Sequence, residues 1–117
     1  MGKLTTHVLD TAHGCPAAGM RVALYRIEDS AALELKSTAL DANGKVTGAL
    51  LEGGDFRRGR YRLVFAVAAY FAARGTALPE PPFLGDVPLD FAIAAADEHY
   101  HVPLLVSPWS YSTYRGS

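Results

Sequence analysis

The chain has 117 residues, of which 50% are hydrophobic, and a formal net charge of −1 from 11 basic and 12 acidic side chains. This length and apolar content predict one domain, residues 1–117, and the balanced charge excludes nucleic acid and membrane surfaces as partners. The single cysteine, Cys15, excludes an intrachain disulfide and a cysteine-based zinc site, and no apolar run approaches the roughly 20 residues of a transmembrane helix.

The N-terminal segment, MGKLTTHVLD, lacks the apolar stretch of a secretory signal peptide, so we expect a cytoplasmic protein. Its alternating pattern predicts a strand over residues 4–9. One face of this strand carries Leu4, Thr6 and Val8, and the other carries Thr5, His7 and Leu9. A turn-rich loop, TAHGCPAAG, follows over residues 11–19.

The middle of the chain predicts further strands by the same alternation. Residues 20–27 form a strand with an apolar face, and residues 33–40 form a weaker one. The sequence Asp41-Ala42-Asn43-Gly44 predicts a tight turn, because Asn-Gly adopts positive φ angles at low cost. We expect a short strand to follow at Val46. Residues 60–67 then predict a clear strand with its aromatic and aliphatic side chains buried.

The C-terminal half contains the one predicted helix. The Ala-rich residues 68–74 end at Gly75, which is the usual residue just beyond a helix C-terminus. After a Pro-rich loop, alternation predicts strands over residues 87–93, 100–106 and 111–115, the last two joined as a hairpin. Seven or eight short strands and one short helix predict an all-β protein, a β-sandwich.

The histidines are the first candidates for chemistry, and they are His7, His13, His99 and His101. Histidine is not a preferred strand residue, and the ordinary interpretation is a surface or hydrogen-bonded structural role. The alternative is that His7 and His101 meet in a cleft as acid–base groups, because imidazole titrates near neutral pH. A zinc site built on His99, His101 and His7 is a third interpretation, but no cysteine or nearby carboxylate strengthens it, so we expect no metal.

Other candidate groups give weaker signals. Cys15 lies close to His13 in sequence, but neighbours in sequence rarely form a catalytic Cys–His pair. The arginines between residues 57 and 62 are typical of a solvated loop and an outward strand face. The last four residues, Tyr-Arg-Gly-Ser, differ from an ordinary frayed terminus, because the strand pattern continues almost to the end of the chain.

Two segments at opposite ends of the chain resemble the transthyretin-like family. The N-terminal LTTHVLD followed by Gly14-x-Pro16-Ala17 is similar to the opening of that family. The C-terminal HYHVPLL through SPWSYSTYRGS is similar to the end of its hydrolytic branch, the 5-hydroxyisourate hydrolases. The terminal YRGS is the most specific element, and transthyretin itself lacks it together with the histidines that match His7 and His101. The resemblance covers the whole chain, including Gly59-x-Tyr61-x-Leu63-Val64-Phe65.

This resemblance implies a transthyretin-like β-sandwich that assembles as a homotetramer, with active sites in clefts between dimers and no cofactor. The implied substrate is the small molecule 5-hydroxyisourate, whose six-membered ring is opened by water during urate breakdown. The implied catalytic residues are His7, His101 and Ser117. The implied substrate-binding residues are Lys45, Pro103, Tyr114, Arg115 and Gly116.

Lys45 is a departure from the pattern of the resembled family, which has arginine after the Asn-Gly or Asp-Gly turn. Lysine keeps the positive charge but lacks the planar pair of donors that arginine offers to a ring carbonyl or an anion. Two other classes of function stay open at this point: a non-enzymatic carrier of small aromatic ligands, as transthyretin is, and a β-sandwich interaction module.

Overall fold

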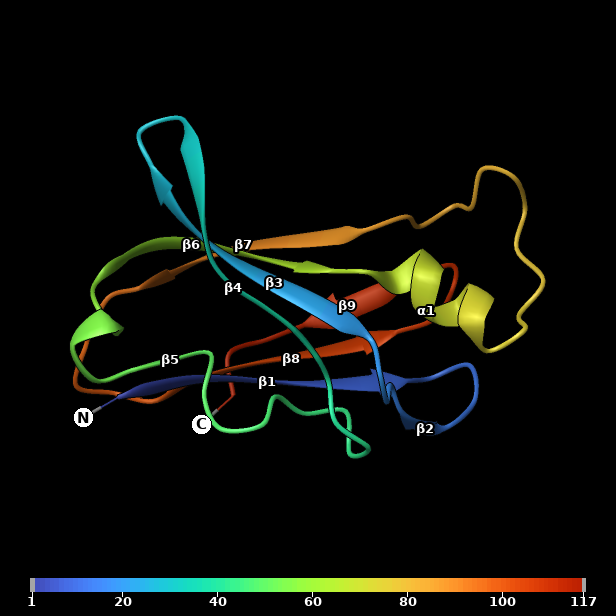
Figure 1. Cartoon of the computed structure of the whole chain (residues 1–117), viewed down its shortest axis with the longest axis horizontal. Coiled ribbons are helices and arrows are strands. Elements are labelled where there is room, and N and C mark those ends of the chain that lie inside the picture. Colours follow the sequence, from blue (N-terminus) through green and yellow to red (C-terminus); the bar gives the residue numbers. More distant parts are fainter. Residues whose placement is uncertain (1, 117) are drawn as a thin grey trace.

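The computed structural model describes residues 2–116 as two β-sheets packed face to face with one helix at an end (Figure 1). The strands are β1 (Lys3–Asp10), β2 (Cys15–Pro16), β3 (Arg21–Glu28), β4 (Ala31–Ala39), β5 (Leu51–Glu52), β6 (Gly59–Phe65), β7 (Val87–Ile93), β8 (Tyr100–Val106) and β9 (Tyr111–Thr113). A 3₁₀ turn covers Gly53–Asp55, and the helix α1 covers Val67–Ala73.

The two ends of the chain share one sheet. This first sheet has the order β2-β1-β8-β9, with β5 also paired to β1, and the second has the order β4-β3-β6-β7. Strands β1 and β8 run parallel in the centre of the first sheet, whereas the other pairs are antiparallel. The predicted all-β sandwich is therefore confirmed.

The core lies between the sheets and follows the predicted alternation. In β1, Leu4 and Val8 are fully buried, and in β8 the buried Leu104 lies on the same inner side. The second sheet contributes Leu24 and Leu63 from β3 and β6, both with no exposed surface. Because inner residues alternate with outer ones along each strand, the outer face of the first sheet carries the remaining side chains of β1 and β8.

Helix α1 begins at Val67 and ends at Ala73, close to the predicted residues 68–74. Gly75 follows with a φ angle of +82°, which a residue without a Cβ adopts at little cost. Its N–H donates to the Ala72 carbonyl and the Thr76 N–H donates to the Phe71 carbonyl, each at 3.0 Å. This pair of bonds is the Schellman ending, and it explains why Gly75 ends the helix.

Three predicted boundaries are wrong in detail. Val46 is not in a strand, because the loop between β4 and β5 follows the edge of β1 through single hydrogen bonds rather than a continuous ladder. The next strand after β4 is β5. The strand predicted over residues 60–67 ends at Phe65, since Val67 already begins the helix. The last strand ends at Thr113 rather than at residue 115. The described residues form nine strands instead of seven or eight, because β2 and β5 are two-residue strands that alternation cannot detect.

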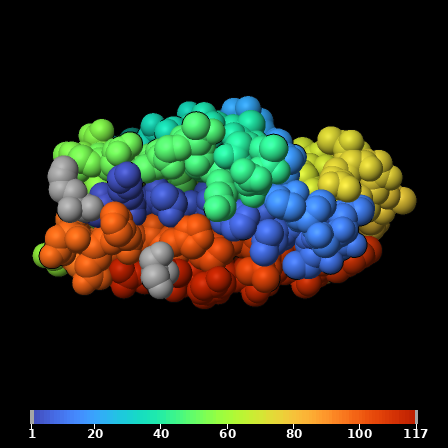
Figure 2. Space-filling view, turned by 90° about the horizontal axis from the view of Figure 1, so that it is seen from below, coloured from blue at the N-terminus to red at the C-terminus, as the bar shows by residue number. Residues whose placement is uncertain are grey.

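The loop between β4 and β5 extends the first sheet beside β1. Val8 N–H donates to the Gly44 carbonyl at 2.9 Å, and Leu50 N–H donates to the Leu4 carbonyl at 2.8 Å. In Figure 2 this loop (green), β1 (blue) and the C-terminal strands (orange to red) lie next to one another across the molecule. Among the described residues, no helix has the length and apolar character that a membrane span requires.

Candidate active site

The outer face of the first sheet brings His7 and His101 onto neighbouring strands. The parallel register of β1 and β8 pairs Thr5 with His101 and His7 with Pro103. Each of these residues alternates with inward-facing core residues, so their side chains emerge on the same side of the sheet. Both histidines are half-buried. The two residues predicted as an acid–base pair therefore lie on neighbouring strands two register positions apart, although 93 residues separate them in the sequence.

Two further predicted residues close on the histidines from the strand edges. Lys45 forms an isolated antiparallel bridge with His7, and Gly116 forms one with His101. The turn before Lys45 is held by the Asp41 carboxylate, whose Oδ1 accepts from the Asn43 and Lys45 N–H groups at 2.8 and 3.1 Å. The site is thus assembled from β1, β8, the loop after β4 and the C-terminal segment.

Burial and positive charge act together on His101. Its Nδ1 lies 2.8 Å from the Thr5 hydroxyl across the strand pair. Burial of the ring, followed by the charges of His7 and Lys45, lowers the pKa of His101 below its usual 6.5. The imidazole is therefore neutral at pH 7, and a neutral imidazole can accept a proton.

Gly116 packs directly against the ring of His101. Its N–H donates to the His101 carbonyl at 2.7 Å, which holds the C-terminal segment on β8. A Cβ atom at this position would lie 2.8 Å from Cδ2 of His101 and 3.2 Å from its Cβ. Because real Cβ atoms essentially never come within 3.0 Å of such a neighbour, only glycine fits here without moving the histidine.

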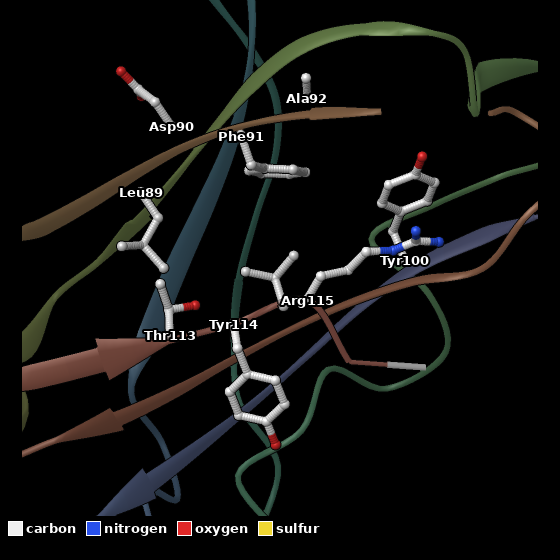
Figure 3. Close-up of a pocket in the computed structure, with 9 residues that line it drawn as sticks. Leu89, Asp90, Phe91, Ala92, Tyr100, Thr113, Tyr114 and Arg115 are labelled. Atoms are coloured by element: carbon white, nitrogen blue, oxygen red, sulfur yellow. The ribbon is translucent and has the colours of Figure 1, made fainter. Parts of the chain in front are cut away.

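The remaining substrate-binding predictions divide between the two sides of the sheet. The pairs Leu105–Ser112 and His101–Gly116 follow one antiparallel register, which places Tyr114 beside Pro103 on the outer face. Figure 3 shows the Tyr114 ring turned away from β7, and 61% of the residue is exposed. Pro103 is buried. Tyr114 and Pro103 thus lie on the side of the sheet that carries the histidines.

Arg115 lies on the other side. Its guanidinium stacks 3.9 Å from the centre of the Tyr100 ring, and Nη2 donates to the Glu98 carboxylate and to the His99 carbonyl at 3.0 Å each. Figure 3 shows this side chain at a pocket of about 250 Å³ between β7 and the C-terminal strands, lined mostly by apolar residues. The chain therefore does not bring Arg115 together with His7 and His101, and Ser117 lies outside the described residues.

Comparison with known proteins shows the family of this chain. The profile of the HIUase/Transthyretin family matches residues 4–116. The chain belongs to the HIUase/Transthyretin family. The 5-hydroxyisourate hydrolase of Pseudomonas aeruginosa is 56% identical over all of this chain and 93% of its own length. The one from Mesorhizobium japonicum is 59% identical over 99% of this chain and 93% of its own.

Solved structures of the HIUase/Transthyretin family and beyond share the fold. The 5-hydroxyisourate hydrolase of Klebsiella pneumoniae has a TM-score of 0.82 at 33% identity, with both chains fully covered. An (S)-allantoin synthase has a TM-score of 0.94 at 48% identity, and this chain spans 44% of that longer chain. A sea bream transthyretin in complex with thyroxine has a TM-score of 0.86 at 27% identity, over 97% of this chain and 94% of that one.

The other histidines of this HIUase/Transthyretin family member lie elsewhere. His99 is exposed and precedes β8, so it lies outside the strand that carries His101. His13 pairs with the Asp10 carboxylate at 2.7 Å, and the Cys15 sulfur accepts from Arg74 at 3.2 Å. No group of three metal-ligating side chains occurs among residues 2–116.

Sequence reasoning missed two polar residues in these surroundings. Thr5 was placed on the correct face, but its bond to His101 depends on which strand lies beside β1. Asp10 is fully buried and accepts from Tyr70 and from the N–H groups of Ala12 and His13. A carboxylate that ends an apolar strand was the available signal, because a buried charge needs such partners.

Proposed function

We propose that this chain is a 5-hydroxyisourate hydrolase that opens the six-membered ring of its substrate to 2-oxo-4-hydroxy-4-carboxy-5-ureidoimidazoline. The observation that carries the proposal is the cluster of His7, Lys45, His101 and Gly116 on one face of the sheet. The high identity to the hydrolases of Pseudomonas aeruginosa and Mesorhizobium japonicum over nearly the whole chain supports the same reaction.

The reaction needs one group that takes a proton and one that gives a proton. Water must lose a proton as it attacks a ring carbonyl, and the ring nitrogen that leaves must gain one. We assign the first task to His101, because its lowered pKa keeps the imidazole neutral and ready to accept. His7, two register positions away on β1, then supplies the proton to the leaving nitrogen.

The other residues of the proposed site bind and orient the substrate. The Lys45 ammonium group is the cation beside the two histidines, and it stabilises the negative charge that develops on the attacked carbonyl oxygen. Tyr114 and Pro103 offer a flat wall for the fused rings. Gly116 lets the C-terminal segment approach His101 closely, and Ser117, the last residue, completes the proposed catalytic set.

We assign Arg115 a different task within the same site. Its contacts with Tyr100, Glu98 and the His99 carbonyl hold the C-terminal segment against the start of β8. In this role the guanidinium positions Gly116 beside His101. The substrate contact that the resemblance implies for Arg115 stays a prediction.

We further propose that this single domain works in the cytoplasm as a homotetramer. Strands β7 and β9 are the last strands of their sheets, and an apolar pocket lies between them. Unpaired edges of this kind are commonly covered by a second copy of the chain. Exposed aromatic side chains at Phe83, Trp109 and Tyr111 favour the same association. Light scattering tests the assembly, and a 12.5 kDa particle at micromolar concentration contradicts it.

The reaction is tested by generating 5-hydroxyisourate from urate with urate oxidase and following the decay of its absorbance. We expect the chain to accelerate the decay, and His7→Ala and His101→Ala each to lower the rate about 10²–10⁴-fold, the usual contribution of an acid–base group. The matched control is His99→Ala, since His99 is exposed outside the strand. A decay no faster than the spontaneous one refutes the hydrolase. Equal losses for His99→Ala and His101→Ala refute the site.

A further inference from the structure

The two ring nitrogens of His101 have different surroundings. Nδ1 lies 2.8 Å from the Thr5 hydroxyl, and these two residues are direct partners in the parallel register of β1 and β8. Among residues 2–116, Nε2 has no hydrogen-bond partner, and the Thr5 hydroxyl has no partner besides Nδ1. Gly116 closes the ring on its Cδ2 side, so the imidazole is held from two directions.

A hydroxyl partner differs in kind from a carboxylate partner. The Thr5 hydroxyl accepts from Nδ1 while that nitrogen is protonated, as it is both in the imidazolium and in the neutral tautomer whose Nε2 is free to take a proton. The same chain shows the contrasting case at His13, whose Nδ1 contacts the Asp10 carboxylate. A carboxylate only accepts and favours the charged imidazolium. Threonine therefore holds the ring in place and favours the imidazolium less than a carboxylate does, because it carries no charge.

We propose that Thr5 is a positioning residue for His101: its hydroxyl holds Nδ1 through both protonation states and leaves Nε2 as the nitrogen that exchanges protons with water or substrate. This inference rests on the proposed hydrolase function. It adds Thr5 of β1 to the proposed active site and assigns Nε2 as the reacting nitrogen of His101. It also explains why the site needs the parallel pairing of β1 with β8, because this pairing places Thr5 directly beside His101.

The charged and titratable groups around His101 come from three elements. On the outer face of β1 they are Lys3 and His7, on the loop after β4 Lys45, and on the C-terminal segment Tyr114. No acidic side chain of the described residues contributes to the shift in the pKa of His101. The Thr5 hydroxyl is thus the group that stabilises the protonated ring here, and its bond to an imidazolium is charge-assisted and therefore stronger than its bond to the neutral ring.

The test compares three threonine variants of the full chain. Thr5→Val keeps the branched shape and removes the hydroxyl, whereas Thr5→Ser keeps the hydroxyl. Thr11→Val is the matched control, because the Thr11 hydroxyl also bonds across to β8, at the Val106 carbonyl 3.1 Å away, but beyond the site. Each is assayed for hydroxyisourate turnover over a range of pH, and His101 is titrated by ¹H–¹⁵N NMR, which also reports the tautomer.

We expect Thr5→Val to lower kcat about 10–100-fold, the usual effect of losing the partner that orients a functional histidine. Its NMR spectrum should show the pKa of His101 moved further down, because the imidazolium loses an acceptor. The acidic limb of the kcat/KM profile should move to lower pH with it. Thr5→Ser should stay within about threefold of the wild type, because it keeps the hydroxyl that bonds to Nδ1. Thr11→Val should do so as well, since a lost neutral hydrogen bond outside the site changes only stability.

Two results overturn the inference while leaving the hydrolase intact. One is an active wild type with a Thr5→Val variant of equal kcat and an unchanged pH profile. The other is a Thr5→Ser variant as damaged as Thr5→Val, because shape and not the hydroxyl would then matter. A wild type that does not accelerate ring opening refutes the proposed function and this inference together. If Thr5→Val does not fold, the wild-type NMR spectrum decides: a His101 Nδ1 resonance of an unbonded nitrogen overturns the inference.

Discussion

Replacing Gly116 by alanine adds one methyl group at the point where the C-terminal segment meets His101. The new Cβ would lie 2.8 Å from Cδ2 of the imidazole, and ordinary contact begins at 3.4 Å, so the ring must retreat by about 0.6 Å. The ring cannot retreat freely, because Nδ1 is bonded to Thr5 on β1. A displacement of about 1 Å costs about 100-fold in rate, so we expect Gly116→Ala to lower kcat about tenfold to thirtyfold.

The assay is hydroxyisourate turnover together with the melting temperature of each variant. Gly85→Ala is the matched control, because Gly85 has an ordinary φ angle and no atom within 4 Å of the position of an added Cβ. We expect Gly85→Ala to retain wild-type turnover, and both variants to keep melting temperatures close to that of the wild type. A Gly116→Ala variant with wild-type kcat would show that the position of His101 does not limit the reaction and would refute the reasoning.

Two other substitutions test the charges in the molecule. Lys45→Ala should raise KM or lower kcat. It should also raise the pKa of His101 in an NMR titration, because the Lys45 charge helps to lower that pKa. Lys45→Arg should remain active, and unchanged kinetics in Lys45→Ala would exclude a substrate contact. Asp10→Asn should cost about 3 kcal/mol, or about 10 °C in Tm, because it removes the charge from a buried carboxylate that accepts from the Tyr70 hydroxyl and from the N–H groups of Ala12 and His13. Burial raises the pKa of Asp10, but the hydrogen bonds from Tyr70 and His13 outweigh it and leave the pKa below 3.8. The stabilisation by the ionised carboxylate should therefore be complete above pH about 4, and it should disappear in acid melts as the pH falls through the pKa of the folded state. An Asp10→Asn variant with wild-type Tm would contradict this account.

The polar contacts of His101 and His13 illustrate why part of the site escapes prediction. Alternation in β1 correctly places Thr5 and His7 on the face opposite Leu4. It does not tell which strand lies beside them, and the bond between Thr5 and His101 spans 96 residues of sequence. The bond between Tyr70 and Asp10 spans 60. Such bonds depend on the packing of distant elements, which a local pattern does not record.

The terminal segment shows the same division on a smaller scale. The resemblance of YRGS to the hydrolytic branch predicts a functional C-terminus, and the contact between Gly116 and His101 is consistent with it. The direction of Arg115 was not predictable from its presence in that motif. It depends on the antiparallel register with β8, which places Arg115 opposite Val102 on the inner side and Gly116 opposite His101 on the outer side.

The sequence by itself determined the all-β class, the buried face of each long strand and the single helix with its glycine ending. These are local properties, because the period of two in a strand and the need for positive φ after a helix are imposed by neighbouring residues. Only the tertiary structure decided that β1 and β8 lie side by side and that Lys45 reaches His7. Several strand edges offer similar backbone donors and acceptors, so no single segment determines which strand pairs with β1. The packing of the whole core determines it.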